Sequence, residues 1–569
     1  MRTIYLLALL LFPFLAMAQY PLPIPPALTG TEFELHLQKG AREFFPGFTT
    51  NTMGVNGDLL GPTLILNKGD LVTMNLINEL DEPTTIHWHG MHVSAANDGG
   101  PHTVIEAGTT WSPQFTVLDH AATYWYHPHL HMKTAEHVTK GIAGFIIVKD
   151  EEEAALELPR SYGEDDFPIV IQSRAFDADM QFIVETAADD VLLVNGVRDP
   201  YLEVPAQVVR LRLLNGSTDR TYNLGFEGNI EFFQIATDGG LLGEPLPMDR
   251  LQLAPGERAE ILLNLNGMAG QSLTLKSFSS ELASGIYGAA SPSPMPVATI
   301  PGYSSNPLNG SDFDILKLNV GSPSVNPITA IPATLVPQNP IPEASAQQTR
   351  NLTFQPQQMG PTGMANGPFV INGASFNLDV INFEIPLGNT EIWQLTNMTG
   401  ISHPFHIHDV QFYVLDVNGA PPPANMLGRK DVVLVPPMGG TVRFITRFED
   451  FADDEVPYMY HCHMLTHEDA GMMGQFIVTG PNATKEPSST DGLKVYPNPA
   501  IDAWNLVFEE NTGEEGYFVL RNSFGQTIRQ FKSIVEPTVQ IPCAELPAGW
   551  YIMEVRTGDQ NYVLSLLKR

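Results

Sequence analysis

Short runs of alternating apolar and polar residues, separated by glycine, proline, asparagine or aspartate, recur along nearly the whole chain. Examples are "PTLILNKGDLVTMNLIN", "GIAGFIIVKD", "ERAEILLNLNG" and "GTVRFITRF". Alternation with a period of two places every second side chain on one face of a strand, and turn residues at this spacing join antiparallel strands. The sequence therefore predicts an all-β fold built from antiparallel sandwiches rather than helical domains.

Three similar phrases, "KGDLVTMNLINEL", "PAQVVRLRLLNGS" and "LGNTEIWQLTNMT", lie near the starts of three blocks of the chain. Such a repeat indicates the same strand of a repeated sandwich, and a length of 569 residues suits three or four domains. We place the blocks at residues 22–150, 160–300 and 310–480, with a proline- and serine-rich connection between the second and the third.

The two ends of the chain differ from these blocks. Residues 1–18 hold the apolar run "IYLLALLLFPFLAMA", which is typical of a secretory signal peptide and shorter than the roughly 20 residues that a membrane span needs. Residues 481–493 are predicted to be a linker, and residues 494–569 a separate module of alternating strands without histidine. No later segment qualifies as a membrane span.

Charge and cysteine content restrict the possible functions. With 63 acidic and 30 basic residues, the formal net charge of −33 repels nucleic acid and anionic membrane surfaces. The two cysteines, Cys462 and Cys543, lie in different predicted domains and form no disulfide framework. An exported Cys462 without a disulfide partner points to metal ligation.

The sixteen histidines are concentrated in the first and third blocks, and none lies between residues 138 and 402. The middle block is therefore predicted to be a spacer or scaffold that holds no histidine site. Because residues i and i+2 of a strand share a face, an H-x-H pair can aim two imidazoles at one place. Four such pairs offer eight ligands to a shared centre: His87 and His89, His127 and His129, His406 and His408, and His461 and His463.

Cys462 lies between the last two histidines and must point to the opposite face of the same strand. A cysteine with two histidines and a weak axial methionine is the ligand set of a blue-copper electron-transfer site. The sequence supplies this set as His403, Cys462, His467 and Met472. A structural zinc site needs only four ligands in a closed tetrahedron, so copper fits the number and type of ligands better.

These motifs resemble those of the multicopper oxidases, a family of laccases, bilirubin oxidases and bacterial cuprous oxidases. "HWHG", "HPH", "HPFHIH" and "HCHMLTHEDAGM" occur here in the family order, within about residues 25–480. The resemblance implies three cupredoxin-like Greek-key β-sandwich domains plus a small C-terminal β-sandwich module. It also implies four copper ions: one type 1 ion in the third domain, and a trinuclear cluster between the first and third domains.

Individual roles follow from the same resemblance. The type 2 copper would be held by His87 and His406, and the two type 3 ions by His89, His127 and His463 and by His129, His408 and His461. The second histidine of "HCH", His463, argues against a copper nitrite reductase. Protons would be supplied by Asp98 and Glu468, with Glu468 facing the channel to the cluster and titrating near the working pH. The plainer alternatives are a turn-forming Asp98 and an exposed or helix-capping Glu468.

The remaining histidines of the two blocks carry less information. His131 shares the face of His127 and His129, but the resemblance gives it no ligand role, so we expect it to lie behind the ligands. Four others either line the approach to the cluster or are surface residues, and we favour the surface: His92, His102, His120 and His137.

The predicted function is laccase-like: one-electron oxidation of phenols or aromatic amines, coupled to reduction of O2 to water. Cuprous oxidases carry a methionine-rich insert in the third domain, whereas residues 304–367 contain only Met359 and Met364, and Thr399 stands where those enzymes have an acid. Oxidation of Cu(I) or another metal ion in copper tolerance remains an alternative, since Met438, Met459, Met464 and Met473 lie near the type 1 motifs. Bilirubin oxidation is a further alternative. A non-enzymatic copper-binding protein is disfavoured because all ten histidine ligands and the cysteine are present.

The tail resembles the C-terminal sorting domain of the type IX secretion system, with "VYPNPA" near its start and "LPAGWYIMEV" near its end. This resemblance implies a secreted or surface protein that meets the type IX machinery. The alternatives are a periplasmic protein and an immunoglobulin-like accessory module. The expected partners are a small-molecule or metal-ion reductant and O2, and we expect a monomer without nucleic-acid partners.

Overall fold

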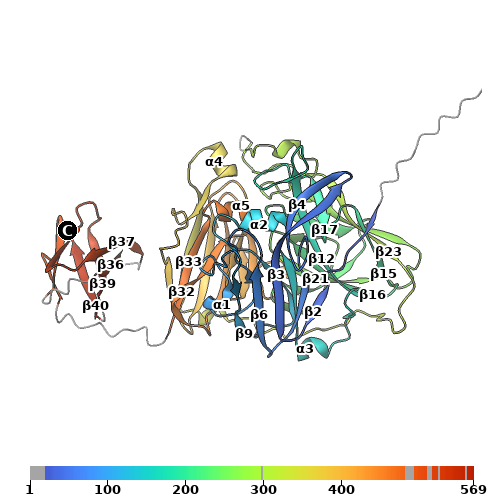
Figure 1. The fold of residues 1–569 in the computed structure, drawn as a ribbon, viewed down its shortest axis with the longest axis horizontal. Helices are drawn as coiled ribbons and strands as arrows, with labels where there is room; N and C mark the ends of the chain where they lie inside the picture. The colour runs from blue at the N-terminus through green and yellow to red at the C-terminus, as the bar shows by residue number, and fades with distance from the viewer. Residues whose placement is uncertain (1–18, 297–298, 481–492, 509–514, 523–525, 558–559) are drawn as a thin grey trace, which may run out of the picture.

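The computed structural model describes residues 19–296, 299–480, 493–508, 515–522, 526–557 and 560–569. The predicted signal peptide and all but the last residue of the predicted linker lie outside these residues. Three β-sandwiches form the main body, and a smaller strand-rich module lies at the left of Figure 1. The all-β prediction is confirmed.

The first sandwich consists of two sheets around a core that includes Leu35, Trp88 and Tyr126. One sheet contains β4 (Phe48–Val55), β3 (Glu32–Phe45), β6 (Leu71–Asn78) and β8 (Thr110–Trp111), with β9 (Gln114–Thr116) also paired to β6. The other contains β2 (Ala27–Thr29), β5 (Thr63–Asn67), β11 (Gly144–Lys149), β10 (Ala122–His127) and β7 (His87–His89). The edge strand β7 thus carries the first H-x-H pair.

The middle sandwich is built in the same way around Leu211, Phe226 and Ile261. One sheet runs β13 (Phe182–Ile183), β12 (Asp166–Phe176), β16 (Val208–Asn215), β21 (Arg258–Asn264), β18 (Phe232–Thr237) and β19 (Gly240–Met248), with β14 (Val191–Val194) beside β12. The other runs β1 (Tyr20–Pro21), β15 (Pro200–Val204), β23 (Asp312–Val320), β22 (Ser272–Phe278), β17 (Tyr222–Phe226) and β20 (Leu251–Leu253). Because β23 pairs with β15 and β22, this sandwich takes in residues beyond 310, where we placed the start of the third block.

The third sandwich packs around Trp393, Phe405 and Phe444. Its sheets are β25 (Phe369–Ile371), β24 (Gln348–Pro356), β27 (Thr390–Asn397), β31 (Gly440–Arg447) and β29 (Phe412–Val417), and β26 (Phe383–Pro386), β33 (Met473–Thr479), β32 (Asp453–Cys462), β28 (His403–Ile407) and β30 (Val432–Val435). Antiparallel pairing of β28 with β32 sets His406 opposite His461 and Phe405 opposite Cys462.

Five short α-helices and four 3-10 turns connect the described strands. The α-helices are α1 (Ala95–Asp98), α2 (Thr134–Lys140), α3 (Glu151–Ala154), α4 (Pro361–Asn366) and α5 (Leu465–Asp469); the turns are η1 (Ser279–Glu281), η2 (Tyr303–Ser305), η3 (Glu343–Ser345) and η4 (Ala424–Met426). Figure 1 shows α2 of the first sandwich beside α5 of the third. The Asp469 carboxylate accepts hydrogen bonds from the amides of Thr134 and Ala135, 3.0 and 2.8 Å away, at the start of α2. This contact ties the first sandwich to the third next to the histidine cluster.

The C-terminal module has two sheets around Trp504, Phe518 and Met553. They contain β34 (Leu493–Tyr496), β35 (Ala503–Phe508) and β38 (Thr538–Pro542), and β37 (Thr527–Ile534), β36 (Glu515–Asn522), β39 (Gly549–Thr557) and β40 (Gln560–Lys568). Arg521 reaches Glu384 of the third sandwich at 2.7 Å. Among the described residues, no helix has the length and apolar character needed to cross a membrane.

Candidate metal centre

Four strands from two sandwiches bring the H-x-H pairs together. In the first sandwich, β7 pairs with β10, so that His87 lies opposite His127. In the third, β28 pairs with β32, so that His406 lies opposite His461. All eight histidines of the four pairs are buried, with at most 1% of each residue exposed. The first and third sandwiches thus face each other across a closed cluster of imidazoles.

Six of these imidazoles form two groups of three nitrogens. Nδ1 of His89 lies 3.3 Å from Nε2 of His127 and 3.2 Å from Nε2 of His463. In the other group, Nε2 of His129 lies 3.1 Å from Nε2 of His461 and 3.2 Å from Nε2 of His408. Three ring nitrogens that converge on one point, with no carboxylate between them, form a metal-binding arrangement.

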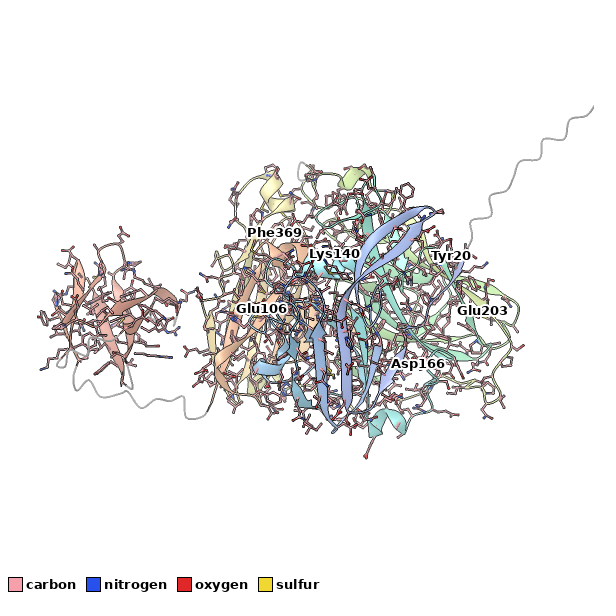
Figure 2. All side chains as sticks on the ribbon, in the orientation of Figure 1. Tyr20, Glu106, Lys140, Asp166, Glu203 and Phe369 are labelled. Atoms are coloured by element: carbon pink, nitrogen blue, oxygen red, sulfur yellow. The ribbon has the colours of Figure 1, made fainter. Side chains whose placement is uncertain are left out.

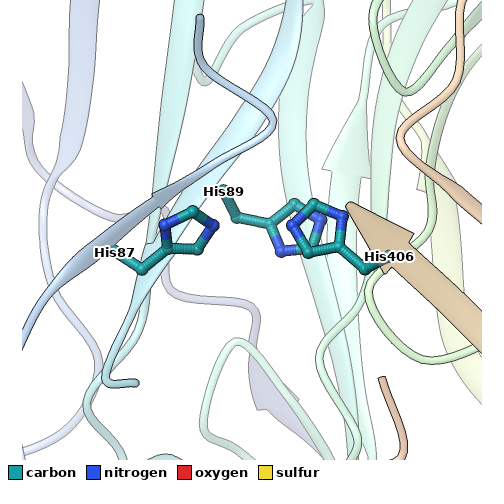
Figure 3. A group of neighbouring side chains, drawn as sticks. All are labelled: His87, His89 and His406. Atoms are coloured by element: carbon teal, nitrogen blue, oxygen red, sulfur yellow. The ribbon is translucent and has the colours of Figure 1, made fainter. Parts of the chain in front are cut away.

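The last two histidines, His87 and His406, have Nε2 atoms that are buried without a hydrogen-bond partner. Figure 3 shows the ring of His406 overlapping that of His89, with the ring of His87 to their left, and the ligand nitrogens of the three lie within 4.8 Å of one another. Nδ1 of His87 is 3.0 Å from the Asp98 carbonyl oxygen, and Nδ1 of His406 is 2.8 Å from that of Asp431. Because each Nδ1–H donates to a carbonyl, each Nε2 keeps a free lone pair for a metal ion.

The burial of the cluster favours neutral imidazoles, which are the form that binds metals. Burial lowers the pKa of His129 to about 3, although the charge of Glu468 opposes this. It also lowers the pKa of five further members well below the usual value: His89, His127, His406, His408 and His463. Neutral nitrogens that lack donors are costly to bury unless an ion binds them, so the residues present fit a group of metal ions.

Asp98 and Glu468 lie directly behind the cluster. The Asp98 carboxylate is 2.7 Å from Nδ1 of His408 and 3.3 Å from Nδ1 of His87. Glu468 lies on α5, where its oxygens are 3.4 Å from Nδ1 of His129 and 3.1 Å from Nδ1 of His461. Both carboxyl groups are 1% exposed, so neither is a surface residue.

The pKa of Glu468 differs from our expectation of a value near the working pH. Burial raises it, but the imidazoles of His129 and His461 stabilise the carboxylate more strongly and lower the pKa to about 2. In the sequence Glu468 stands next to His467, but nothing there shows that the Nδ1 atoms of His129 and His461 lie against its carboxylate. An ionised carboxylate behind two histidines also fixes their tautomers and orients their Nε2 atoms.

Cys462 belongs to a second group on the other face of β32. Its Sγ lies 3.4 Å from Nδ1 of His403 and 3.7 Å from Nδ1 of His467. Met472 is fully buried in the same core cluster, and its carbonyl accepts a hydrogen bond from the Cys462 amide. Burial raises the pKa of the Cys462 thiol well above its usual value, so a thiolate here depends on a bound cation.

The surroundings of the second group leave one histidine within reach of the surface. The ring of Phe369, labelled in Figure 2, packs 4.7 Å from the rings of both His403 and His467. Nε2 of His403 is covered by the Thr399 hydroxyl at 2.8 Å, and both of these residues are fully buried. His467 is partly exposed, whereas the other proposed ligands are buried.

The remaining histidines lie outside both groups. His131 packs against Phe376, with ring centroids 5.1 Å apart, and His102 lies 2.7 Å from the Gln475 amide oxygen. His92 contacts Asp409, and His120 lines a polar cavity of about 440 Å³ at the surface. The surface expectation does not hold for His137, which is fully buried and bonded to the Thr84 hydroxyl at 3.0 Å, because α2 packs inward against β4 and α5.

Two residues at the cluster were missed in the sequence. Asp431 contacts His89 and His406, and Gly256 of the middle sandwich lies so close to His463 that a Cβ atom would come within 2.9 Å of its ring. Gly256 carries no chemical signature. A signal for the middle block did exist, because arginines stand at inward positions of "QVVRLRLLN" and "ERAEILLN", and a buried charge requires a partner.

Eight converging imidazoles between two sandwiches, beside a buried Cys-His-His group, define a copper protein of the oxidase type. Residues 36–153 and 343–482 each match a family profile described as multicopper oxidase, and residues 494–569 match a secretion system C-terminal sorting domain. The chain belongs to the multicopper oxidase family, and it is an oxidoreductase that uses copper and O2.

Named relatives extend along most of the chain. A multicopper oxidase of Staphylococcus haemolyticus is 36% identical over 456 residues, which are 79% of this chain and 88% of the relative. The cell division protein FtsP of Photorhabdus laumondii is 31% identical over 477 residues, 82% of this chain and 93% of that protein. The family therefore includes relatives that are named for a role other than oxidation.

Solved structures agree with the fold. A laccase-like multicopper oxidase CueO from Ochrobactrum sp. superposes with a TM-score of 0.70 at 33% identity, covering 81% of this chain and 100% of that one. The McoA multicopper oxidase of Aquifex aeolicus has the same TM-score and coverage at 31% identity. The three main sandwiches are therefore cupredoxin-type domains, and the sorting tail marks the chain for secretion to the cell surface or the exterior.

Proposed function

We propose that this oxidase is laccase-like, taking single electrons from phenols or aromatic amines and delivering four of them to O2. The observation that carries the proposal is the partly exposed His467, whose ring leads from the surface to the buried Cys462 sulfur. Phe369, which is fully buried, packs against this ring and fixes its orientation.

The proposed enzyme binds four copper ions per chain. His403, Cys462, His467 and Met472 would hold a type 1 ion, and His87 and His406 a type 2 ion. The type 3 ions would be held by His89, His127 and His463 and by His129, His408 and His461. The converging nitrogens and the unpartnered Nε2 atoms support these sets. When bound, copper supplies the redox chemistry, because it accepts and releases one electron at a time.

The chain itself connects the two groups and handles protons. Cys462 is joined by peptide bonds to His461 and His463, so a short covalent path runs from the sulfur to two imidazoles of the cluster. Asp98 and Glu468 face Nδ1 atoms of cluster histidines, where a carboxylate can accept or return a proton. Burial of the cluster excludes bulk water, so these two carboxylates are the proposed relays that pass protons to it.

Metal-ion oxidation is the second candidate, and one observation favours it. Met398 and Met438 flank Thr399 and are 48% and 51% exposed. Thioethers are soft ligands that suit Cu(I), and these two stand beside the residue that covers His403. Against this candidate, Thr399 puts a neutral hydroxyl next to His403, where a carboxylate would attract a cation.

Comparison of two reductants tests the proposal. Oxygen uptake by the copper-loaded protein is measured with a dimethoxyphenol and with Cu(I), to give kcat/KM for each. A higher value for the phenol, unchanged when Met398 and Met438 are both replaced by leucine, supports the laccase-like function. A higher value for Cu(I) that falls in the double variant would replace it with the metal-ion oxidase.

A further inference from the structure

Arg258 is the first residue of β21 in the middle sandwich, and its guanidinium lies at a junction of all three main sandwiches. An arginine has five N–H donors, and here each of them has an acceptor. Two go to the Asp431 carboxylate of the third sandwich, both at 2.6 Å. The other three go to carbonyl oxygens of the first and middle sandwiches, at distances of 3.0, 3.1 and 2.9 Å: Thr123, Gly256 and Asp238. Because all five donors are bonded and only 1% of the residue is exposed, the guanidinium of Arg258 is held in one orientation.

Asp431 in turn contacts two of the cluster histidines. Its Oδ1 lies 3.1 Å from Nε2 of His89, and its backbone carbonyl lies 2.8 Å from Nδ1 of His406. His89 is therefore protonated on Nε2 and turns Nδ1 toward the cluster, whereas His406 is protonated on Nδ1 and turns Nε2 inward. The two rings stack with centroids 3.8 Å apart, so moving one displaces the other.

The glycine of "HWHG" makes room for this pair. Gly90 has a φ of +86°, and a Cβ atom there would lie 2.3 Å from the Asp431 carboxylate and 2.7 Å from the Arg258 guanidinium. The first sandwich thus leaves open the space in which the other two sandwiches meet. Three separate parts of the sequence are shaped around one ion pair.

We propose that Arg258, from the domain without copper ligands, is a positioning residue for the histidine cluster. By fixing Asp431 it sets the tautomers and the stacking of His89 and His406, and so determines how tightly the cluster binds copper. The inference rests on the proposed copper sites. It means that the middle domain positions histidines of the cluster and is more than a scaffold. Losing such a partner of a metal-binding histidine typically costs about 10- to 100-fold in metal affinity.

The test uses the copper-loaded full chain with Arg258→Lys, which keeps the positive charge but cannot donate both bonds from one planar group. Copper per chain is followed during titration with a chelator, together with the blue absorption of the Cys462 site and the electron paramagnetic resonance signal of type 2 copper. We expect a normal blue band, with copper lost from the cluster at about 10- to 100-fold lower chelator concentration and an altered type 2 signal.

Arg350→Lys is the matched control. Arg350 forms a similar buried pair with Glu391, with two hydrogen bonds of 2.9 and 2.8 Å, and this pair does not contact the cluster. Asp431→Asn, which keeps the size and the carbonyl contact to His406, should repeat the effect of Arg258→Lys. The inference is overturned if Arg258→Lys retains copper like the control, or if it loses the blue band in parallel and so acts on the whole fold. A wild-type chain that binds no copper would instead overturn the proposed function.

Discussion

Cys462 shows how one residue can belong to two sites. Its side chain joins the group with His403 and His467, while its neighbours His461 and His463 point into the histidine cluster on the other side. This division follows from the alternation of side chains along β32. The distance between the groups is therefore fixed by the backbone rather than by side-chain packing.

Replacing Cys462 with serine is expected to remove the blue absorption band and oxidase turnover, because serine lacks the thiolate that gives the band. Copper at the histidine cluster should remain, since its ligands lie on the opposite face. Absorption spectra and copper content of the purified variant test this. A blue Cys462→Ser protein would refute the assignment of Cys462.

Met472→Leu tests the proposed axial ligand. Leucine has a similar volume and fits the buried core around Met472, so the protein should stay folded and blue. Loss of the thioether donor destabilises the oxidised ion, and the reduction potential of the type 1 site should therefore rise. A redox titration measures it, with Met464→Leu as a buried control in the same core cluster. An unchanged potential would mean that Met472 is not a ligand.

Glu468→Gln tests the proposed proton relay. Glutamine keeps the shape of the side chain but cannot exchange a proton, so oxygen consumption should fall by ~10²-fold or more, while reduction of the type 1 site by substrate stays fast. Stopped-flow reduction without oxygen separates the two steps. Turnover within a few-fold of wild type would leave Asp98 as the relay to examine next.

At the level of elements, the loops after β7 and β28 are joined by His92 and Asp409, whose side chains are 2.8 Å apart. Burial lowers the pKa of His92, but the charge of Asp409 outweighs it and raises the pKa from 6.5 to about 10. A histidine whose pKa is higher in the folded state stabilises the fold fully below its unfolded value. That contribution is lost as the pH rises toward 10.

The unfolding temperature should therefore decrease between pH 6.5 and 10, and this decrease should be smaller in His92→Gln. His36→Gln is the control, because His36 also pairs with two carboxylates but lies in solvent, where screening weakens the pairs. Identical pH profiles for wild type and His92→Gln would contradict the role of this contact.

The sequence predicts some elements of the site better than others. The H-x-H pairs were readable because a strand has a fixed period of two, so spacing alone gives the face. The low pKa of Glu468 was not, because it depends on His129 of the first sandwich, which lies beside the carboxylate only in the folded chain. Arg258 and Asp431 could not be paired either, since 173 residues separate them and either charge alone looks like surface. The start of the third block was placed before β23 because its strand pattern resembles that of any other strand.

For the whole molecule, the contacts within the main body differ from those between the main body and the C-terminal module. The three sandwiches share buried ion pairs, and the first and third also share the histidine cluster. Within the described residues, Arg521 and Gln530 of the module contact the main body through an ion pair and a hydrogen bond. The module also has its own core and no histidine. These features predict that the main body is complete without the module.

A chain ending near residue 482 is expected to fold, to bind copper and to oxidise substrate at a rate close to that of the full chain. In a host with type IX secretion, the shortened chain should remain inside the cell envelope, because the sorting domain is absent. Copper content, turnover and the amount of enzyme in the medium test both points. Loss of copper on truncation would show that the module supports the catalytic unit.

The most direct measurement is the ratio of phenol oxidised to O2 consumed, made together with the copper content of the same sample. The account predicts four copper ions per chain, four one-electron oxidations for each O2 and no hydrogen peroxide, because all four electrons reach O2 in the closed histidine cluster. Two one-electron oxidations per O2 with hydrogen peroxide as the product, or a chain that stays active with only the Cys462 site filled, would contradict it.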